Sequence, residues 1–310
     1  MAGPIAAFAQ TSLQFSAFQR LSNQETFLQL TSPTGLNYRI DVSFNLFGWN
    51  SFLTYFAVSN AFQHTDSAAP FLASRMYRAL QLEGTNIVTG EHLPTINGDL
   101  TLHRIYHAAV ALSWSSRMVY VDPSTNRFAG LPLADLILFS HPHPDHFNAT
   151  SITALRSSNG IIVVPQAVYD LLTSAQKTNA LVLTNGVSTN LFGIGIEAVA
   201  MYNTNSSPLH PKGWGNGYVL TFADKRVYLS GDTDNTPEMR GLTNIDVAFL
   251  CMRGPPPNMD VPDALRAVHA FRPSVVYPYH YTTNTVTRFK EQLGTDLGIE
   301  VRLRDWYVKP

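Results

Sequence analysis

The stretch Ser140-His141-Pro142-His143-Pro144-Asp145-His146 places four side chains of metal-binding type within six residues. It follows an apolar run, residues 135–140, that is typical of a buried strand. Because a tight loop can direct alternating side chains into one cavity, His141 and His143 can bind one ion while Asp145 and His146 face a second. Zinc accepts imidazole nitrogen and carboxylate oxygen. A surface loop with scattered histidines is the alternative, and the density of ligands in this string argues against it.

Two later segments also end β-rich runs in polar residues: Tyr228-Leu-Ser-Gly231-Asp232-Thr-Asp234 and Tyr277-Pro-Tyr-His280. A carboxylate that leaves a strand across a glycine can lie between two cations, with one oxygen to each. Taken alone, Gly-Asp-Thr is a weak signal, because aspartate after glycine is common in turns. His280 alone indicates a structural histidine rather than a ligand.

Around these segments, short β-rich runs alternate with helical stretches from Gly98 onward. The predicted strands are 99–106, 108–114, 117–121, 135–140, 161–165, 195–201, 218–222, 226–230, 246–251 and 274–278. Several end in His, Asp or Asn. Loops at strand ends are where layered α/β folds build sites on a rigid scaffold.

Residues 1–95 differ in composition, being rich in Phe, Gln, Ser and Asn, and contain no motif that carries chemistry. Strands at 26–31 and 37–44 flank the turn Ser32-Pro-Thr-Gly35 and predict a hairpin, and a helix is expected over 70–81. We expect an accessory region that acts as a lid over a site or as a subunit interface of a homo-oligomer.

Composition excludes several classes of protein. With 310 residues and 45% hydrophobic content the chain can bury a large core, and a net charge of -1 gives no basic field for nucleic acid. A single cysteine, Cys251, excludes an intramolecular disulfide framework and any zinc site built from several thiolates. No apolar stretch approaches the roughly 20 residues of a membrane span. Residues 1–10 lack a positive charge, so we predict no signal peptide and a cytoplasmic protein.

Taken in order, these elements resemble the metallo-β-lactamase-fold hydrolase superfamily, most closely the branch of ascorbate-6-phosphate lactonase and the N-acylphosphatidylethanolamine phospholipase D relatives. The resemblance covers about residues 97–304 and is supported by Ile105-Tyr-His107-Ala, Val121-Asp122-Pro, His210-Pro-Lys-Gly and Gly231-Asp-Thr-Asp-Asn-Thr-Pro. It implies an α/β fold, an αββα sandwich with two metal ions at one edge, as a hydrolase domain over residues 96–310.

The resemblance also implies a ligand set: His141 and His143 for the first metal, Asp145, His146 and His280 for the second, and Asp232 as the bridge. One ligand departs from the pattern, because Asn203 stands about where the superfamily has a third histidine for the first metal. His210, seven residues later, can reach back as a ligand or contact the substrate. Otherwise the first metal is weakly held or absent. His107 is interpreted as a structural histidine or one that orients a ligand.

The expected enzyme is a metallohydrolase in which a metal-bridging hydroxide cleaves an ester, lactone or thioester of a small metabolite. Asp145, His146 and Asp232 are the expected catalytic residues, with Asp145 passing a proton to the leaving group. Zinc is the expected metal, and manganese and iron accept the same ligands. The candidate substrate contacts are Asn203, Lys212, Trp214, Arg253 and Tyr281. The alternatives are a phosphodiesterase acting on a small or lipid phosphodiester, and a metal-binding protein without turnover.

Overall fold

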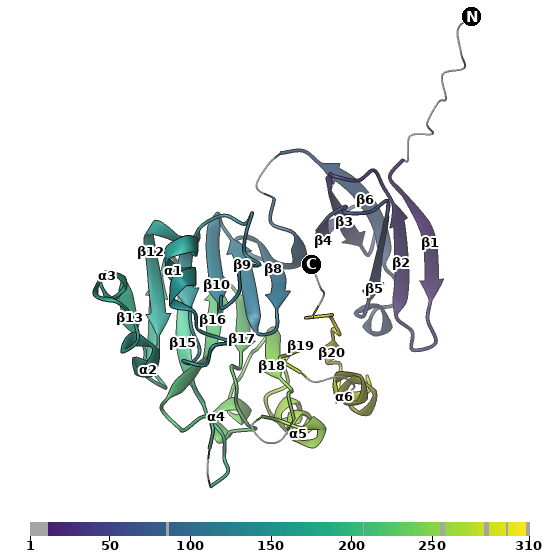
Figure 1. Ribbon diagram of the computed structural model, residues 1–310. Helices are drawn as coiled ribbons and strands as arrows, with labels where there is room; N and C mark the ends of the chain where they lie inside the picture. Colours follow the sequence, from purple (N-terminus) through teal and green to yellow (C-terminus); the bar gives the residue numbers. More distant parts are fainter. Residues whose placement is uncertain are drawn as a thin grey trace, which may run out of the picture. The chain divides into compact units, whose positions relative to one another are not determined.

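A computed structural model describes residues 12–84, 87–206, 208–254, 258–281, 285–295 and 297–307 (Figure 1). Residues 1–10, for which the sequence predicts no signal peptide, lie outside the described residues. The chain forms two compact units, Met1–His92 and Leu93–Pro310. Among the described residues, no helix has the length and apolar character needed to cross a membrane.

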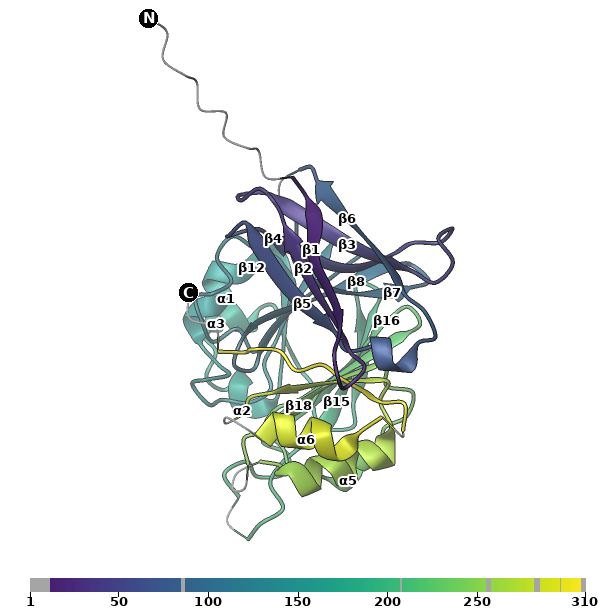
Figure 2. The same ribbon diagram turned by 90° about the vertical axis from the view of Figure 1, so that its right-hand side faces the viewer.

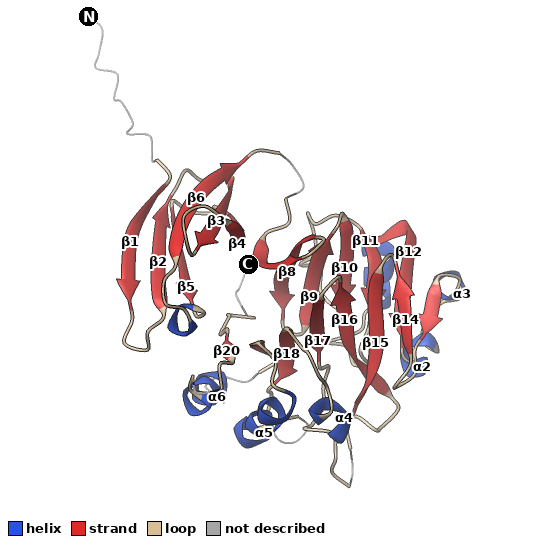
Figure 3. Cartoon of the chain, turned by 180° about the vertical axis from the view of Figure 1, so that it is seen from behind, coloured by secondary structure: helices blue, strands red, loops and turns tan. Residues whose placement is uncertain are grey.

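The first unit consists mainly of strands, drawn red in Figure 3. One antiparallel sheet has the order β1 (Gln14–Arg20), β2 (Thr26–Thr31), β5 (Ala61–Asp66). In a second group of strands, β3 (Asn37–Ser43) pairs with β4 (Asn50–Phe56) and β6 (Met76–Leu82), and β7 (Gly90–Thr95) begins beside β4. A short 3-10 helix spans Ala69–Phe71. Buried side chains from both groups, including Leu28, Leu30, Tyr38 and Ile40, form the core of this unit.

Two predictions for this unit are wrong. The strands at 26–31 and 37–44 form, but not as a hairpin, because β2 pairs with β1 and β5 whereas β3 pairs with β4 and β6. Placing the strands in different sheets lets the buried faces of both contribute to one core. The helix expected over 70–81 is instead the 3-10 turn and β6, whose antiparallel pairing with β3 outweighs the helix propensity of its residues.

The second unit contains two sheets. In the first sheet, strands β13, β12, β11, β10, β9 and β8 lie side by side in that order. In the second sheet, strands β14 to β20 lie side by side in the order of the sequence. The strands of the first are β8 (Gly98–Tyr106), β9 (Ala109–Trp114), β10 (Arg117–Val121), β11 (Ala134–Leu138), β12 (Arg156–Val164) and β13 (Ala180–Val182). Those of the second are β14 (Ser188–Leu191), β15 (Ile194–Met201), β16 (Gly215–Phe222), β17 (Lys225–Leu229), β18 (Val247–Cys251), β19 (Val275–Tyr279) and β20 (Glu300–Val301). All ten predicted strands are confirmed. The prediction missed β13, β14 and β20, which are too short to show a clear pattern.

Helices complete the layers of this unit. Apolar side chains of both sheets share one core, including Leu136 and Leu138 of β11 and Phe249 of β18. A second core joins the outer face of the β14–β20 sheet to α4 (Pro237–Arg240), α5 (Val261–Phe271) and α6 (Thr285–Leu293), and Figure 2 shows α5 beside α6. On the other sheet, α1 (Ala149–Leu155), α2 (Gln166–Tyr169) and α3 (Ser174–Lys177) lie against β12 and β13. The predicted αββα arrangement is confirmed.

Candidate metal centre

Three strands of the second unit end in a residue with left-handed backbone that contributes to one polar cluster. His107 follows β8, Asp122 follows β10 and His280 follows β19, with φ of 58°, 48° and 46°. Positive φ is uncommon outside glycine, although Asp and His adopt it more readily than most residues. Such backbone strain gathers at functional sites. The fold therefore holds three strained strand ends where it assembles this cluster.

Asp122 anchors the histidine-rich loop that follows β11. Its Oδ1 accepts from the backbone N of Ser140 at 2.7 Å, and its Oδ2 accepts from Ser140 Oγ at 2.6 Å and from His146 Nδ1 at 2.7 Å. Asp122 is fully buried. Because a carboxylate only accepts, Nδ1 of His146 carries a hydrogen and donates it to Asp122. The sequence supplied Asp122 only as part of the resemblance, without a role.

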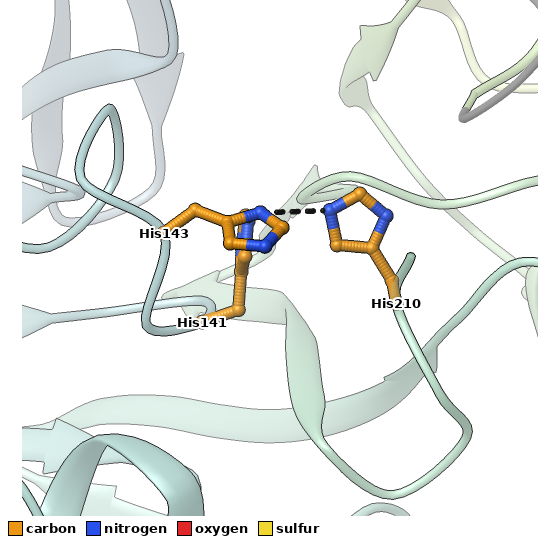
Figure 4. A group of neighbouring side chains, drawn as sticks. All are labelled: His141, His143 and His210. Atoms are coloured by element: carbon orange, nitrogen blue, oxygen red, sulfur yellow. Dashed lines mark hydrogen bonds between the residues drawn. The ribbon is translucent and has the colours of Figure 1, made fainter. Parts of the chain in front are cut away.

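His141, His143 and His210, here called the first group, turn their rings toward one another (Figure 4). His143 Nδ1 lies 3.0 Å from His141 Nε2 and 3.1 Å from His210 Nε2. The three ring centroids are 4.7, 4.8 and 4.9 Å apart, so the rings are nearly equidistant. His141 and His143 come from the loop after β11, and His210 comes from the loop between β15 and β16.

Hydrogen bonds behind the rings leave this group rich in lone pairs. Ser140 Oγ gives its hydrogen to Asp122, so at 2.9 Å it accepts from Nδ1 of His141. Nδ1 of His210 donates to Asn203 Oδ1 at 2.8 Å. The Nε2 atoms of His141 and His210 therefore carry no hydrogen. The single hydrogen that His143 Nδ1 can carry can be donated to only one of them.

A cation fits this arrangement. At zinc–nitrogen distances near 2.0–2.1 Å, two ligands of a tetrahedral site lie about 3.3 Å apart, close to the observed separations. Burial lowers the pKa of His141 well below its usual value and that of His210 to about 4, so both imidazoles are neutral near pH 7. Neutral imidazole is the form that binds metals.

Asp145, His146 and His280, the second group, lie beside the first. His280 Nε2 is 3.3 Å from Asp145 Oδ2, and the rings of His146 and His280 are 5.1 Å apart, a separation similar to those in the first group. Among the described residues, the buried His146 Nε2 has no hydrogen-bond partner. A buried nitrogen that faces carboxylates is a position for positive charge, which a proton or a metal ion can supply.

Asp232 lies between the two groups. Its Oδ2 is 3.7 Å from His210 Nε2 and 3.4 Å from His280 Nε2, and its Oδ1 is 3.3 Å from His146 Nε2. The thiol of Cys251 also donates to Oδ1, at 3.4 Å. Gly231, with φ of +59°, precedes Asp232, and a Cβ there would lie 2.5 Å from Met201 Sδ. The glycine therefore permits the close approach that brings Asp232 into the cluster.

The charges within the cluster are mutually dependent. Burial by itself disfavours the charged forms, yet His146 and His280 lower the pKa of Asp232 well below its usual value. Burial alone would also lower the pKa of His146, but the Asp232 and Asp122 carboxylates raise it well above its ordinary value. Likewise, burial raises the pKa of Asp145, and hydrogen bonds from His107 and His280 more than offset it, so the net shift is downward. The cluster thus holds its carboxylates ionised and attracts a cation.

The predicted substrate contacts are dispersed. Trp214 lies next to the first group, with its ring 5.0 Å from that of His143. Arg253 is close enough for its charge to act on His143, whose pKa is lowered mainly by burial. Lys212 Nζ is paired with Glu238 Oε1 at 2.5 Å, and the Tyr281 hydroxyl donates to the Arg304 carbonyl at 3.0 Å. Asn203 holds His210.

Known proteins that resemble this chain identify its family. Residues 101–280, more than half of the chain, match the family described as the β-lactamase superfamily domain. The chain belongs to the β-lactamase superfamily. All residues of the first and second groups lie within or at the end of the matched region, as do His107, Asp122 and Asp232.

Relatives of this β-lactamase superfamily chain are named as metal-dependent hydrolases of the UPF0173 group. One from Thermus thermophilus is 32% identical over 188 residues, 57% of this chain and 81% of the relative. A second, from Thermococcus kodakarensis, is 30% identical over 190 residues, 57% of this chain and 82% of the relative. The predicted superfamily is confirmed. Its lactonase and phospholipase D branch stays a prediction.

Solved structures show the same fold. A protein from Parabacteroides distasonis, named as a metal-dependent hydrolase, is 35% identical with a TM-score of 0.65, over 70% of this chain and 98% of its own. Igni18, a metallo hydrolase from Ignicoccus hospitalis, is 22% identical with a TM-score of 0.56, over 67% of this chain and 96% of its own. The likeness to Igni18 concerns the fold alone. The family match begins at residue 101, so the role of residues 1–95 stays a prediction.

Proposed function

We propose that this metal-dependent hydrolase of the β-lactamase superfamily holds two divalent cations, with zinc as the first candidate, and cleaves an ester, lactone or thioester of a small metabolite. The observation that carries the proposal is the position of Asp232. Its two oxygens face histidines of both groups, at 3.3–3.7 Å. One carboxylate shared between two sets of imidazole nitrogens is an arrangement suited to a pair of ions.

The first ion would be held by His141, His143 and His210, and the second by Asp145, His146 and His280, with Asp232 contacting both. Two such ions lower the pKa of a bound water from 15.7 to about 7 and polarise a substrate carbonyl. Two ligands of the first group are buried and hydrogen-bonded to a neighbour. His141 is held by Ser140, and His210 is held by Asn203. Such partners fix the tautomer and the orientation of a ligand.

Asp145 is the side chain best placed to move a proton. Its side chain is 40% exposed, whereas those of Asp232, His146 and His280 are at most 3% exposed. Its lowered pKa keeps it ionised at neutral pH, so it can accept a proton from the attacking water. We propose that it returns this proton to the leaving group.

The surroundings favour an ester-type substrate over a phosphodiester. Lys212, one of two cations that could pair with a phosphate, is already paired with Glu238 and its Nζ lies 4.8 Å from the centre of the Tyr202 ring. Trp214 supplies a flat apolar surface beside the first group. We propose Trp214 and Arg253 as substrate contacts, and phosphodiesters as the alternative that the experiment below tests.

The experiment combines elemental mass spectrometry with a hydrolysis panel of lactones, esters, thioesters and phosphodiesters. The native chain should hold about two ions, His210→Ala about one, and Asp232→Ala fewer than one, with hydrolysis lost in both variants. His269→Ala, which changes an exposed histidine on α5, is the matched control and should keep both ions. Turnover of phosphodiesters alone would replace the proposed substrate class, and two ions without turnover would indicate a binding protein.

A further inference from the structure

His107 contacts the carboxylate of Asp145, and the ligand atoms of His107, Asp145 and His280 lie within 4.8 Å of one another, so distance alone would allow these three residues to hold an ion. His107 Nε2 lies 3.1 Å from Asp145 Oδ2, the same oxygen that His280 Nε2 approaches at 3.3 Å. The rings of His107 and His280, however, are only 3.9 Å apart and tilted by 45°.

The distance between ring centres distinguishes histidines that bind one ion from a histidine placed like His107. Two imidazoles that bind one ion at tetrahedral angles have ring centres about 5 Å apart. The first group, at 4.7–4.9 Å, and the His146–His280 pair, at 5.1 Å, satisfy this spacing. His107, packed on His280 at 3.9 Å and 6.3 Å from His146, does not.

The fold fixes His107 from several sides. Its backbone N donates to the Trp306 carbonyl at 3.1 Å, and its carbonyl accepts from the backbone N of His280 at 3.4 Å. Its Nδ1 lies 3.1 Å from the hydroxyl of Tyr307, whose single hydrogen can be donated either to this nitrogen or to the carbonyl oxygen of Tyr281 at 2.9 Å. A neutral ring that donates from Nε2 accepts at Nδ1, so Tyr307 donates to Nδ1 when Nε2 donates to Asp145. The left-handed backbone of His107 is therefore held by the C-terminal segment, and its ring plane is set by Tyr307.

Among the acidic residues of the cluster, Asp145 most needs a hydrogen bond that fixes the orientation of its carboxylate. It lies on a turn and its side chain is 40% exposed, so water competes for its oxygens. Asp232, by contrast, is buried and approached from three sides. A hydrogen bond to one oxygen of Asp145 fixes the direction of the other, and small misplacements of a group at a reacting centre are costly.

We propose that His107 is a positioning residue: it donates from Nε2 to Asp145 Oδ2 and, with its ring held by Tyr307, keeps the Asp145 carboxylate directed at the second ion. The inference rests on the proposed two-ion function, because it concerns the affinity of the second group.

Two substitutions distinguish positioning from a structural role. In His107→Gln the amide nitrogen can reach the place of Nε2 and donate to Asp145. In His107→Asn the amide reaches only the place of Nδ1, but Asn adopts the left-handed backbone more readily than Gln. A structural role therefore predicts that Asn is the milder change, whereas positioning predicts that Gln is.

The measurement is a Co²⁺ titration of the metal-free full chain, followed by visible absorption, with the thermal midpoint of the metal-free protein as a control for folding. We expect His107→Asn to weaken the second ion about 10–100-fold and to leave the first ion unchanged. His107→Gln should stay within a few-fold of the native chain, and Tyr307→Phe should fall between the two.

Equal affinities in the native chain and His107→Asn, or a greater loss in His107→Gln, would overturn the positioning role. So would X-ray absorption of the saturated His107→Asn protein that shows one imidazole ligand fewer, because His107 would then be a ligand itself. If the native chain takes up fewer than two ions, the proposed two-ion function fails first and the inference fails with it. Two ions in the native chain with no effect of His107→Asn would refute the inference alone.

Discussion

The side-chain oxygen of Asn203 accepts two hydrogen bonds from His210, one from its backbone N at 3.0 Å and one from its Nδ1 at 2.8 Å. The backbone N of Asn203 in turn donates to the carbonyl of His210 at 2.9 Å. The residue that departs from the expected histidine pattern thus holds the histidine that joins the first group. Asp234 secures the arrangement by accepting from Asn203 Nδ2 at 3.1 Å.

Asn203→Ala should therefore weaken the first ion. Without the acceptor at Nδ1, His210 loses its fixed tautomer and orientation, and we expect a 10–100-fold lower affinity of that ion in a metal titration. Asn205→Ala, in the same loop but exposed, is the matched control and should bind like the native chain. Unchanged affinity in Asn203→Ala would mean that His210 does not depend on this contact.

Asp122→Ala should destabilise the metal-free protein strongly. The substitution removes the buried acceptor of Ser140 N, Ser140 Oγ and His146 Nδ1, and breaking a buried ionic contact by removing one partner costs about 3–5 kcal/mol. Urea unfolding measures the loss. Asp170→Ala, at an exposed position, should change the free energy of unfolding by no more than about 0.5 kcal/mol. A loss at Asp122 as small as that at Asp170 would contradict the anchoring role.

Acid should destabilise the metal-free protein between pH 6.5 and about 4. Burial lowers the pKa of His210 from 6.5 to about 4, so in this window the folded chain binds fewer protons than the unfolded chain. The contribution of this group is fully present above pH 6.5 and is lost as the pH falls through about 4. The thermal midpoint should fall further between pH 7 and pH 4 in the native chain than in His210→Asn, by about 2–4 °C for each kcal/mol that this group contributes. Parallel falls in the two proteins would show that His210 does not titrate in this way.

Gly231→Ala should cost more stability than Gly213→Ala. Both glycines have positive φ, +59° and +84°, so alanine is strained at either position. A Cβ at Gly213 would meet nothing within 4 Å, whereas one at Gly231 would lie 2.5 Å from Met201 Sδ and 3.2 Å from Ser140 Cβ. We expect Gly213→Ala to cost about 1 kcal/mol and Gly231→Ala about 1–3 kcal/mol more, measured by urea unfolding. Similar costs would show that Met201 moves aside freely.

Strand positions in the second unit could be predicted because apolar runs such as 135–140 and 246–251 record burial directly. Pairing could not. The strands at 26–31 and 37–44 carry the right pattern, but alternation specifies which face is buried and not which neighbour pairs, so the hairpin prediction failed. The helix predicted over 70–81 failed for a related reason, since pairing with β3 decided the structure of β6.

By itself, the sequence determined the chemistry of the centre: a loop dense in histidine and aspartate after a buried strand, and an aspartate that follows a glycine at the end of another. Only the tertiary structure decided which histidine joins His141 and His143, because His210 reaches His143 from 67 residues away through a loop whose path no local pattern encodes. The structure likewise assigned Asp122 and His107 their partners. Local periodicity reports burial, whereas a metal centre depends on distances between atoms that the chain brings together only when its sheets pack.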